Sequence, residues 1–295
     1  MKMKETTAND KSNDLYFGGH LVAFIHILGR SRHLTKLQEK RQWECRELTI
    51  AAFRETYGKI IKFRRFFSDF LSEFTKPSPL DDALRHVLGG EELKVCEHIG
   101  SNRTLNRSLS DSLILTFPLI GSNGLFPLNS IYGVLAACAA SILMAFNYGF
   151  AVRGAIEIGP CLFDITTNEV YGTALSGAVR SEKEADWPRI LVGPELVVYL
   201  RECLELPQGS TINQLNSSSA ALCLKVVSRV DDGLYFLDYL SPEFTDLWPL
   251  PNIDMAVQGA VKFIKSQISE NDSTKVKNKY EMLKAYFVSR GIAAF

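Results

Sequence analysis

The chain has 295 residues, of which 46% are hydrophobic, enough to fill the core of one large domain. Lysine and arginine (33) balance aspartate and glutamate (33), so the formal net charge is zero, which excludes the strong basic field typical of nucleic-acid-binding proteins. The six cysteines include no CxxC pair, which argues against a zinc site and for reduced thiols. We therefore predict a cytoplasmic protein with no nucleic-acid partner.

The N-terminal end is polar and charged and lacks the apolar segment of a signal peptide, so we expect residues 1–16 to form a disordered tail. The stretch 21–30, LVAFIHILGR, then has seven apolar residues among its first eight. This pattern predicts a buried strand that ends in a tight turn at the glycine. His26 interrupts the apolar run. It is typical either of a hydrogen-bonded core histidine, which this stretch alone favours, or of a site at the strand end.

Residues 31–100 have a helical pattern. Apolar residues recur at three- and four-residue spacings from 31 to 74, which predicts two helices, and Pro77 and Pro79 end the second of them. A further helical piece over 80–99 is broken at Gly89 and Gly90. We therefore predict a single domain over residues 17–295 with a helical insertion around 31–100.

The pattern over residues 104–119 predicts two strands. They meet at a turn around Ser110, Asp111 and Ser112, since these residue types favour tight reversals. Asp111 is therefore either an ordinary turn aspartate or a site residue, and the pattern supports both interpretations equally.

The stretch 131–146 carries no charge and contains many small residues. A membrane span needs about 20 strongly apolar residues, and it often has basic residues at an end. Because alanine, glycine and serine dilute this stretch and no basic cluster flanks it, we predict a closely packed helix in the core or at a subunit interface, capped by Asn129. An integral membrane protein built on residues 131–152 is the alternative.

The second half of the chain alternates strands and helices. We predict strands at 151–159, 163–167 and 188–192, a turn leading into a helix over 168–184, a helix over 193–203, a surface loop at 211–221, a hairpin of 222–230 with 234–240, and helices at 255–269 and 276–290. This order predicts the α+β class, with helices on the faces of a sheet.

Four segments of the chain are informative through their order and spacing, although none is decisive alone. They are VAFIHILGRS (22–31), SLSDSLIL (108–115), RGAIEIG (153–159) and YGTALSGAVRSEKEADWPRILV (171–192). With them the chain resembles the class III nucleotidyl cyclases, and within these the bacterial pyrimidine cyclases of the Pycsar anti-phage system. DDGLYFLDYL (231–240) and KYEMLKAYFVSR (279–290) resemble that group's C-terminal elements. The resemblance implies a ferredoxin-like sheet, a homodimer with sites between the subunits, and attack of a ribose 3′-hydroxyl on the α-phosphate of a nucleoside triphosphate.

The resemblance also implies a metal site. Family members hold two divalent ions between a first-strand carboxylate and a hairpin carboxylate, and these positions are His26 and Asp111 here. An imidazole gives one neutral nitrogen to one metal and cannot bridge two, and Mg²⁺ prefers oxygen ligands. The expected cofactor is Mn²⁺ or Mg²⁺, and the altered pair is compatible with a single ion such as Mn²⁺ or with none.

The remaining site residues are implied by position in the family pattern. The turn after the first strand corresponds to the phosphate-binding turn, whose backbone N–H groups face the β- and γ-phosphates, and comprises Ile27, Leu28, Gly29 and Arg30. Arg30 is alternatively a plain surface arginine. Arg107 and Glu169 take the base-recognition positions.

The transition-state pair of the family maps to Ser176 and Arg180, four residues apart and so on one helix face. In that role Arg180 stabilises charge on the α-phosphate and Ser176 orients the ribose. A salt bridge of Arg180 with Glu182 or Glu184 is the structural alternative.

The leading hypothesis is a soluble, homodimeric cyclase that converts UTP, or CTP, to a 3′,5′-cyclic nucleotide as an anti-phage messenger. The second hypothesis is a catalytically inactive homologue that binds a nucleotide or a partner, because His26 alters the metal site.

Overall fold

The computed structural model describes residues 15–29, 45–75, 105–109, 111–119, 128–164, 166–167, 169–207, 209–246, 248, 253–293 and 295. They form one mixed sheet with the strand order β2-β3-β1-β4-β6-β8-β7, and β5 pairs with β4 beside this path. The β4–β6 pair is parallel and the other pairs are antiparallel. The strands are β1 (Leu15–Ile27), β2 (Leu105–Leu109), β3 (Ser112–Pro118), β4 (Val152–Asp164), β5 (Glu169–Gly172), β6 (Ile190–Val192), β7 (Val227–Arg229) and β8 (Tyr235–Leu237).

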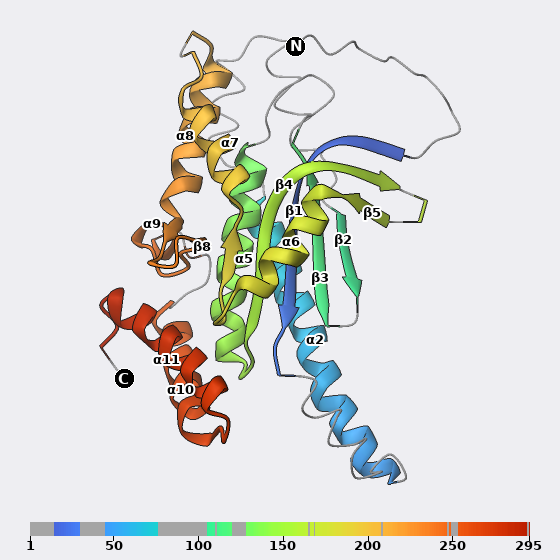
Figure 1. The fold of residues 1–295 in the computed structure, drawn as a ribbon, viewed down its shortest axis with the longest axis vertical. Helices are drawn as coiled ribbons and strands as arrows, with labels where there is room; N and C mark the ends of the chain where they lie inside the picture. Colours follow the sequence, from blue (N-terminus) through green and yellow to red (C-terminus); the bar gives the residue numbers. More distant parts are fainter. Residues whose placement is uncertain are drawn as a thin grey trace.

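Helices cover both faces of this sheet, which confirms the predicted α+β class (Figure 1). The helix α6 packs across β4 and β1 on one face, while α5 lies on the other face and is covered in turn by α2, α8 and α10. The helices are α2 (Arg46–Phe74), α5 (Leu128–Asn147), α6 (Thr173–Glu184), α7 (Pro194–Leu204), α8 (Thr211–Lys225), α9 (Pro242–Thr245), α10 (Ile253–Glu270) and α11 (Thr274–Ser289).

From residue 20 to residue 25 the strand β1 is mostly buried on both faces, because it lies between β3 and β4 and under helices on each side. Leu21, Ala23, Ile25 and Ile27 join the large core with α5. The alternate side chains face α6, where Val22 is part of a smaller core. A strand covered in this way has to be apolar at nearly every position, which explains the run LVAFI.

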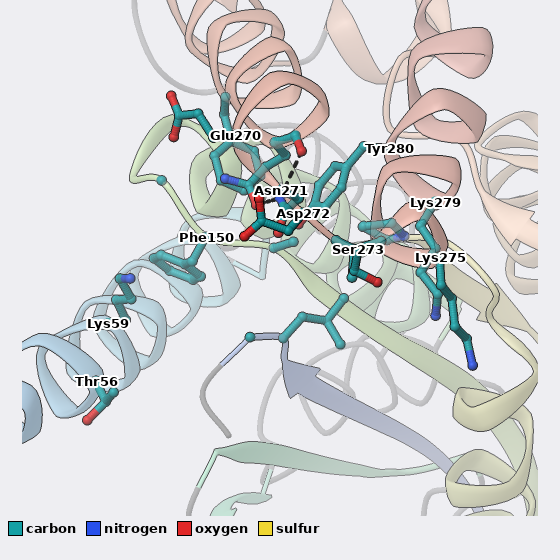
Figure 2. A pocket seen from close by; sticks show the side chains of 18 residues that line it. Thr56, Lys59, Phe150, Glu270, Asn271, Asp272, Ser273, Lys275, Lys279 and Tyr280 are labelled. Atoms are coloured by element: carbon teal, nitrogen blue, oxygen red, sulfur yellow. Dashed lines mark hydrogen bonds between the residues drawn. The ribbon is translucent and has the colours of Figure 1, made fainter. Parts of the chain in front are cut away.

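A cavity opens at the end of β1, between α2 on one side and the turn that joins α10 to α11 on the other (Figure 2). The turn residues Leu28 and Gly29 form part of its wall. Gly29 has φ +84°, a left-handed backbone conformation that favours glycine. The predicted tight turn after the first strand is therefore present.

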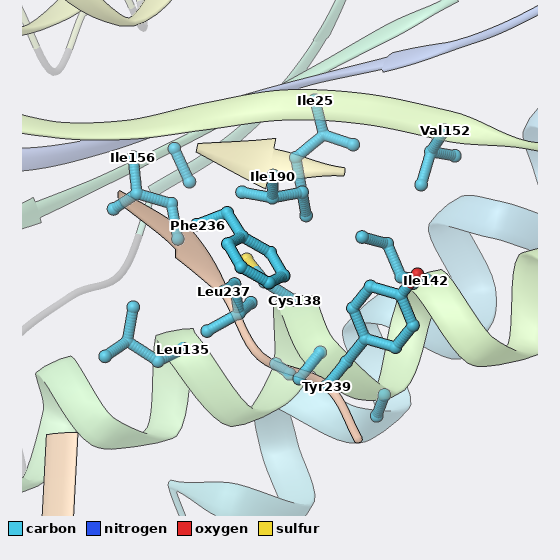
Figure 3. Close-up of a cluster of buried hydrophobic side chains, with 14 of the residues drawn as sticks. Ile25, Leu135, Cys138, Ile142, Val152, Ile156, Ile190, Phe236, Leu237 and Tyr239 are labelled. Carbon is cyan, nitrogen blue, oxygen red and sulfur yellow. The ribbon is translucent and has the colours of Figure 1, made fainter. Parts of the chain in front are cut away.

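The helix α5 forms the centre of the large core. Figure 3 shows Leu135, Cys138 and Ile142 of this helix beneath side chains of β1, β4, β6 and β8. Among the described residues one helix is long and apolar enough to cross a membrane, the window 130–147, and 78% of that window is buried inside the fold. Packing in the core therefore accounts for its uncharged composition, and it is not exposed as a surface for a second subunit.

The first predicted hairpin is present, with β2 and β3 meeting at Asp111. The second is present but shorter than the predicted 222–230 with 234–240: β7 and β8 are joined across residues 230–234, and residues 222–225 belong to α8. The predicted strand at 163–167 is wrong as a separate element. β4 runs continuously to Asp164, where the carboxylate accepts hydrogen bonds from the N–H groups of Thr166 (2.8 Å) and Thr167 (3.3 Å) and turns the chain into β5.

The predicted loop at 211–221 is wrong, because these residues belong to α8. The Ser210 side chain caps this helix by accepting a hydrogen bond from the N–H of Asn213 (3.2 Å). Asn216, Ser219 and Cys223 are buried as α8 packs against α7 and α5. Tertiary packing here overrides the low helix propensity of serine and asparagine.

The N-terminal predictions are only partly covered by the described residues. β1 already begins at Leu15, so the last two residues of the predicted tail lie in a strand, and residues 1–14 lie outside the described part. Residues 46–74 form one continuous helix where two were expected over 31–74. The rest of the predicted insertion, 31–44 and 76–100, lies outside the described residues, as does Arg30.

Candidate functional site

The structure brings His26 and Asp111 together at the end of β1. In the antiparallel β1–β3 pair His26 stands opposite Ser112, and the N–H of Ile27 donates to the carbonyl of Asp111 (3.0 Å). The His26 Nε2 atom lies 3.7 Å from Oδ2 of Asp111, and its Nδ1 lies 3.1 Å from the hydroxyl of Ser112. Both side chains are partly exposed, at 30% and 25%, so solvent and a ligand can reach them.

The donor atoms of this pair fit one metal ion and do not fit two. When Nδ1–H of His26 donates to Ser112, the Nε2 lone pair is free to bind a metal beside the Asp111 carboxylate. Among the described residues no group of three or more histidine, cysteine, aspartate or glutamate side chains gathers around a common point. An ion held here would therefore take its other ligands from water or from phosphate oxygens, as Mn²⁺ and Mg²⁺ commonly do.

Two further charged residues lie at the same end of the sheet. Arg153 of β4 is the direct partner of His26 in the β1–β4 register. Its guanidinium Nε forms an ion pair with the carboxylate of Glu182, which is buried near the end of α6. This ion pair ties the C-terminal part of α6 to the strand that flanks His26. Arg153 begins the segment RGAIEIG, but its partner depends on how α6 packs, which no local pattern predicts.

The turn after β1 offers fewer backbone donors than the phosphate-binding interpretation requires. The N–H of Ile27 is bonded to Asp111, and the N–H of Leu28 donates to the carbonyl of Ala151 (2.8 Å). Both amides therefore continue the sheet and already have acceptors. In the described part of the turn, the backbone N–H of Gly29 is therefore the remaining candidate donor to a phosphate.

Ser176 and Arg180 lie on the exposed side of α6. The residues of this helix that face the sheet are Ala174, Gly177, Ala178 and Glu182. The Ser176 hydroxyl donates to the carbonyl of Gly172 (3.1 Å), one turn back in the chain. Both predicted transition-state residues consequently face away from the sheet. Glu182 does form an ion pair, but with Arg153, as described above.

A buried carboxylate lies beneath α6. Glu157 of β4 accepts a hydrogen bond from the Ser181 hydroxyl (2.7 Å). Burial raises the pKa of Glu157, and the nearby charge of Arg180 opposes this in part. Arg180 thus lies within electrostatic range of a buried acid that the sequence pattern did not single out.

The two predicted base-binding residues are separated in this chain. Arg107 lies on β2, opposite Ile114, and Glu169 begins β5, opposite Asp164. Three strands, β3, β1 and β4, lie between β2 and β5. At about 4.8 Å per strand spacing, the two backbones are about 19 Å apart across the sheet. Within this chain the two residues therefore do not share a common pocket.

Comparison with known proteins gives one distant match. No protein-family model matches the sequence, and no curated protein matches it. Among solved structures the chain is similar to a bacterial light-regulated adenylyl cyclase, with a TM-score of 0.40 and 7% sequence identity. The match covers 85% of this chain and 59% of that structure. This chain therefore spans less than two thirds of the length of the adenylyl cyclase chain. A likeness this distant assigns no activity.

Proposed function

We propose that this protein is a nucleotidyl cyclase of the class III type that converts UTP, or CTP, to the 3′,5′-cyclic nucleotide and pyrophosphate. The observation that carries the proposal is the pairing of His26 with Asp111, whose Nε2 and Oδ2 atoms lie 3.7 Å apart where β1 ends beside the β2–β3 turn. The order of the four resembling segments supports the same activity.

The proposed chemistry is mainly electrostatic positioning. One divalent ion held by His26 and Asp111 would neutralise phosphate charge and lower the pKa of the attacking 3′-hydroxyl. The imidazole ligand favours Mn²⁺ over Mg²⁺. Arg107 and Glu169 are the proposed base-binding residues, and Gly29 with Arg30 the proposed phosphate-binding ones.

The position of α6 supports a homodimer as the active form. Because Ser176 and Arg180 are exposed and face away from their own sheet, they are better placed to reach a site on a second subunit. In that arrangement Arg180 stabilises charge on the α-phosphate and Ser176 orients the ribose. A cytoplasmic location and an anti-phage role for the product complete the proposal, and both rest on the sequence resemblance.

The second candidate function is a nucleotide-binding homologue without catalytic activity. It is favoured by the donor set itself, since the described residues offer His26 and Asp111 but no third metal ligand near them. Two-metal catalysis requires carboxylates that bridge or separately hold both ions. A chain with this set can retain nucleotide binding without turnover.

The test is to incubate the purified protein with each of the four ribonucleoside triphosphates and Mn²⁺ or Mg²⁺, and to identify products by mass spectrometry. Asp111→Ala is expected to abolish cyclic product, while Asp231→Ala, an exposed turn aspartate, is the matched control and should leave it unchanged. A cyclic purine product would contradict the pyrimidine specificity. Full activity in Asp111→Ala would remove this residue from the site.

His26→Asp separates the two candidate functions. The substitution restores a second carboxylate, so it is expected to raise turnover with Mg²⁺ if the chain is an active cyclase with a weakened metal site. If the unmodified chain binds nucleotide but forms no product, and His26→Asp restores formation, the inactive homologue is the correct description. If neither the unmodified chain nor His26→Asp binds a nucleotide or forms a product, both candidate functions are contradicted.

A further inference from the structure

The cavity at the end of β1 is lined by neither His26 nor Asp111. His26 belongs to the alternate set of β1 side chains, with Val22 and Phe24, that faces α6. The cavity lies among residues of the other face, including Phe150 and Phe263, which belong to the core on the α5 side. Its volume of about 760 Å³ is within the range of small-molecule sites.

One part of the cavity wall is aromatic. Phe150, Phe263 and Tyr280 line it, and each exposes less than a tenth of its surface. These rings are therefore held rigidly by the core behind them, with Phe263 and Tyr280 packed edge to face at 5.8 Å. Rigid rings of this kind suit the organic part of a ligand.

The opposite part of the wall is cationic. Lys275 and Lys279 lie one turn apart on α11, and in Figure 2 both ammonium groups extend in the same direction, toward β4. Within the described residues neither forms an ion pair, whereas Lys59 across the cavity is paired with Glu55 (3.1 Å). Like charges at this spacing repel each other. The pKa of Lys279 is lowered by burial and further by the positive charges of Arg153 and Lys275.

Acidic residues are also present but lie at another place on the wall. Glu270 ends α10 and Asp272 lies in the turn to α11. Figure 2 shows the Glu270 carboxylate pointing away from the two lysines. Asp186 lies within electrostatic range of Lys279 and offsets part of its charge. The first turn of α11, which begins at Thr274, adds the positive end of a 16-residue helix to the basic side.

We propose that this cavity is a second ligand site, for a small organic molecule that carries two or more phosphate groups. Lys275 and Lys279 bind the phosphates, and the aromatic wall contacts the organic part. The site contains neither His26 nor Asp111, and it adjoins the proposed cyclase site at Leu28 and Gly29, which line the cavity. Ligand binding there does not depend on cyclase activity. Such a ligand would act as an effector of the protein and not as its substrate.

Isothermal titration calorimetry with tripolyphosphate and with ATP tests the proposal on the full chain, in buffer containing EDTA so that no metal–phosphate complex forms. Lys275→Gln and Lys279→Gln are each expected to weaken binding of both probes about tenfold, since each removes one charge-assisted contact. Lys277→Gln, the same charge change on the same helix outside the cavity wall, is the matched control and should change affinity less than twofold. Equal melting temperatures by circular dichroism verify that the variants fold.

The inference is overturned if the unmodified chain binds neither probe at millimolar concentration, or if Lys277→Gln weakens binding as much as the other two variants. His26→Ala and Asp111→Ala test separateness in a parallel titration with ATP and Mn²⁺ in place of EDTA, and both are expected to leave the binding that depends on Lys275 and Lys279 unchanged. Loss of binding in these variants would assign the phosphates to the proposed cyclase site. If the chain forms no cyclic product but binds tripolyphosphate through Lys275 and Lys279, the proposed function fails and the second ligand site is supported. The two proposals can therefore fail independently.

Discussion

The carboxylate of Asp238 holds α11 against the sheet, and its removal gives the sharpest test of the packing described above. Asp238 follows β8 and is 2% exposed. It accepts hydrogen bonds from the hydroxyl of Tyr286 (2.7 Å) and the hydroxyl of Ser228 (2.7 Å), and forms an ion pair with Arg290. The Tyr286 hydroxyl also accepts from the N–H of Leu240 (3.0 Å). The strands β7 and β8 and the helix α11 therefore meet at one carboxylate.

The expected cost of Asp238→Ala follows from what each partner loses. Tyr286 is buried, so its hydroxyl proton is left without an acceptor, which costs about 1–3 kcal/mol. The Arg290 side chain is 32% exposed and can be hydrated, so its lost ion pair adds about 1 kcal/mol or less. The sum is about 1–4 kcal/mol of unfolding free energy. Asp238→Asn keeps an oxygen that can accept from Tyr286 and should cost about 1–2 kcal/mol.

Urea unfolding followed by circular dichroism measures these differences, with Asp231→Ala as a control for loss of an exposed aspartate, expected within about 0.5 kcal/mol of the unmodified chain. The expected order of destabilisation is Asp238→Ala, then Asp238→Asn, then the control. A loss below about 1 kcal/mol for Asp238→Ala would refute the argument that α11 is held by this network.

Three further predictions concern buried groups. Because burial raises the pKa of Glu157, ionisation of this carboxyl group lowers the stability of the fold as the pH rises above about 4.5. Glu157→Gln, whose amide oxygen still accepts a hydrogen bond from Ser181, should therefore raise the melting temperature at pH 7. This gain should disappear as the pH falls to about 4.5. A Cβ at Gly193 would collide with the Glu157 carboxylate, so Gly193→Ala should cost about 1–3 kcal/mol in urea unfolding, and a smaller cost in a Glu157→Ala background would verify the cause. A thiol reagent should modify exposed Cys45 much faster than buried Cys138, whose pKa burial raises; equal rates in mass spectra of labelled peptides would contradict this packing.

The elements that the sequence predicted well are those whose signal is local. The run LVAFIHILGR is apolar because helices cover the strand it forms on both faces. The uncharged stretch 131–146 is apolar because α5 is enclosed by the sheet and by other helices. Each segment keeps this composition along its length. β1 nevertheless begins at Leu15, six residues before the predicted start. Its first part contains Gly18 and Gly19, which do not favour strands, and is held by pairing with residues 159–164 of β4.

The candidate site was less accessible to sequence reasoning. His26 and Asp111 were selected through the family resemblance, and the β1–β3 register then places them side by side. The Arg153–Glu182 ion pair depends on the β1–β4 register and on the docking of α6, neither of which a local pattern encodes. Lys275 and Lys279 have the spacing of an ordinary solvated helix face, and only the fold places the turn after β1 beside them.

The central place of α5 has a consequence for synthesis of the chain. One of the helices that cover it, α10, begins at Ile253, more than a hundred positions after α5 ends at Asn147. During translation an uncharged helix long enough to cross a membrane is therefore made before all of the helices that cover it. A chain terminated prematurely after residue 252 would keep this helix partly uncovered, and it would become a target for chaperones and for aggregation.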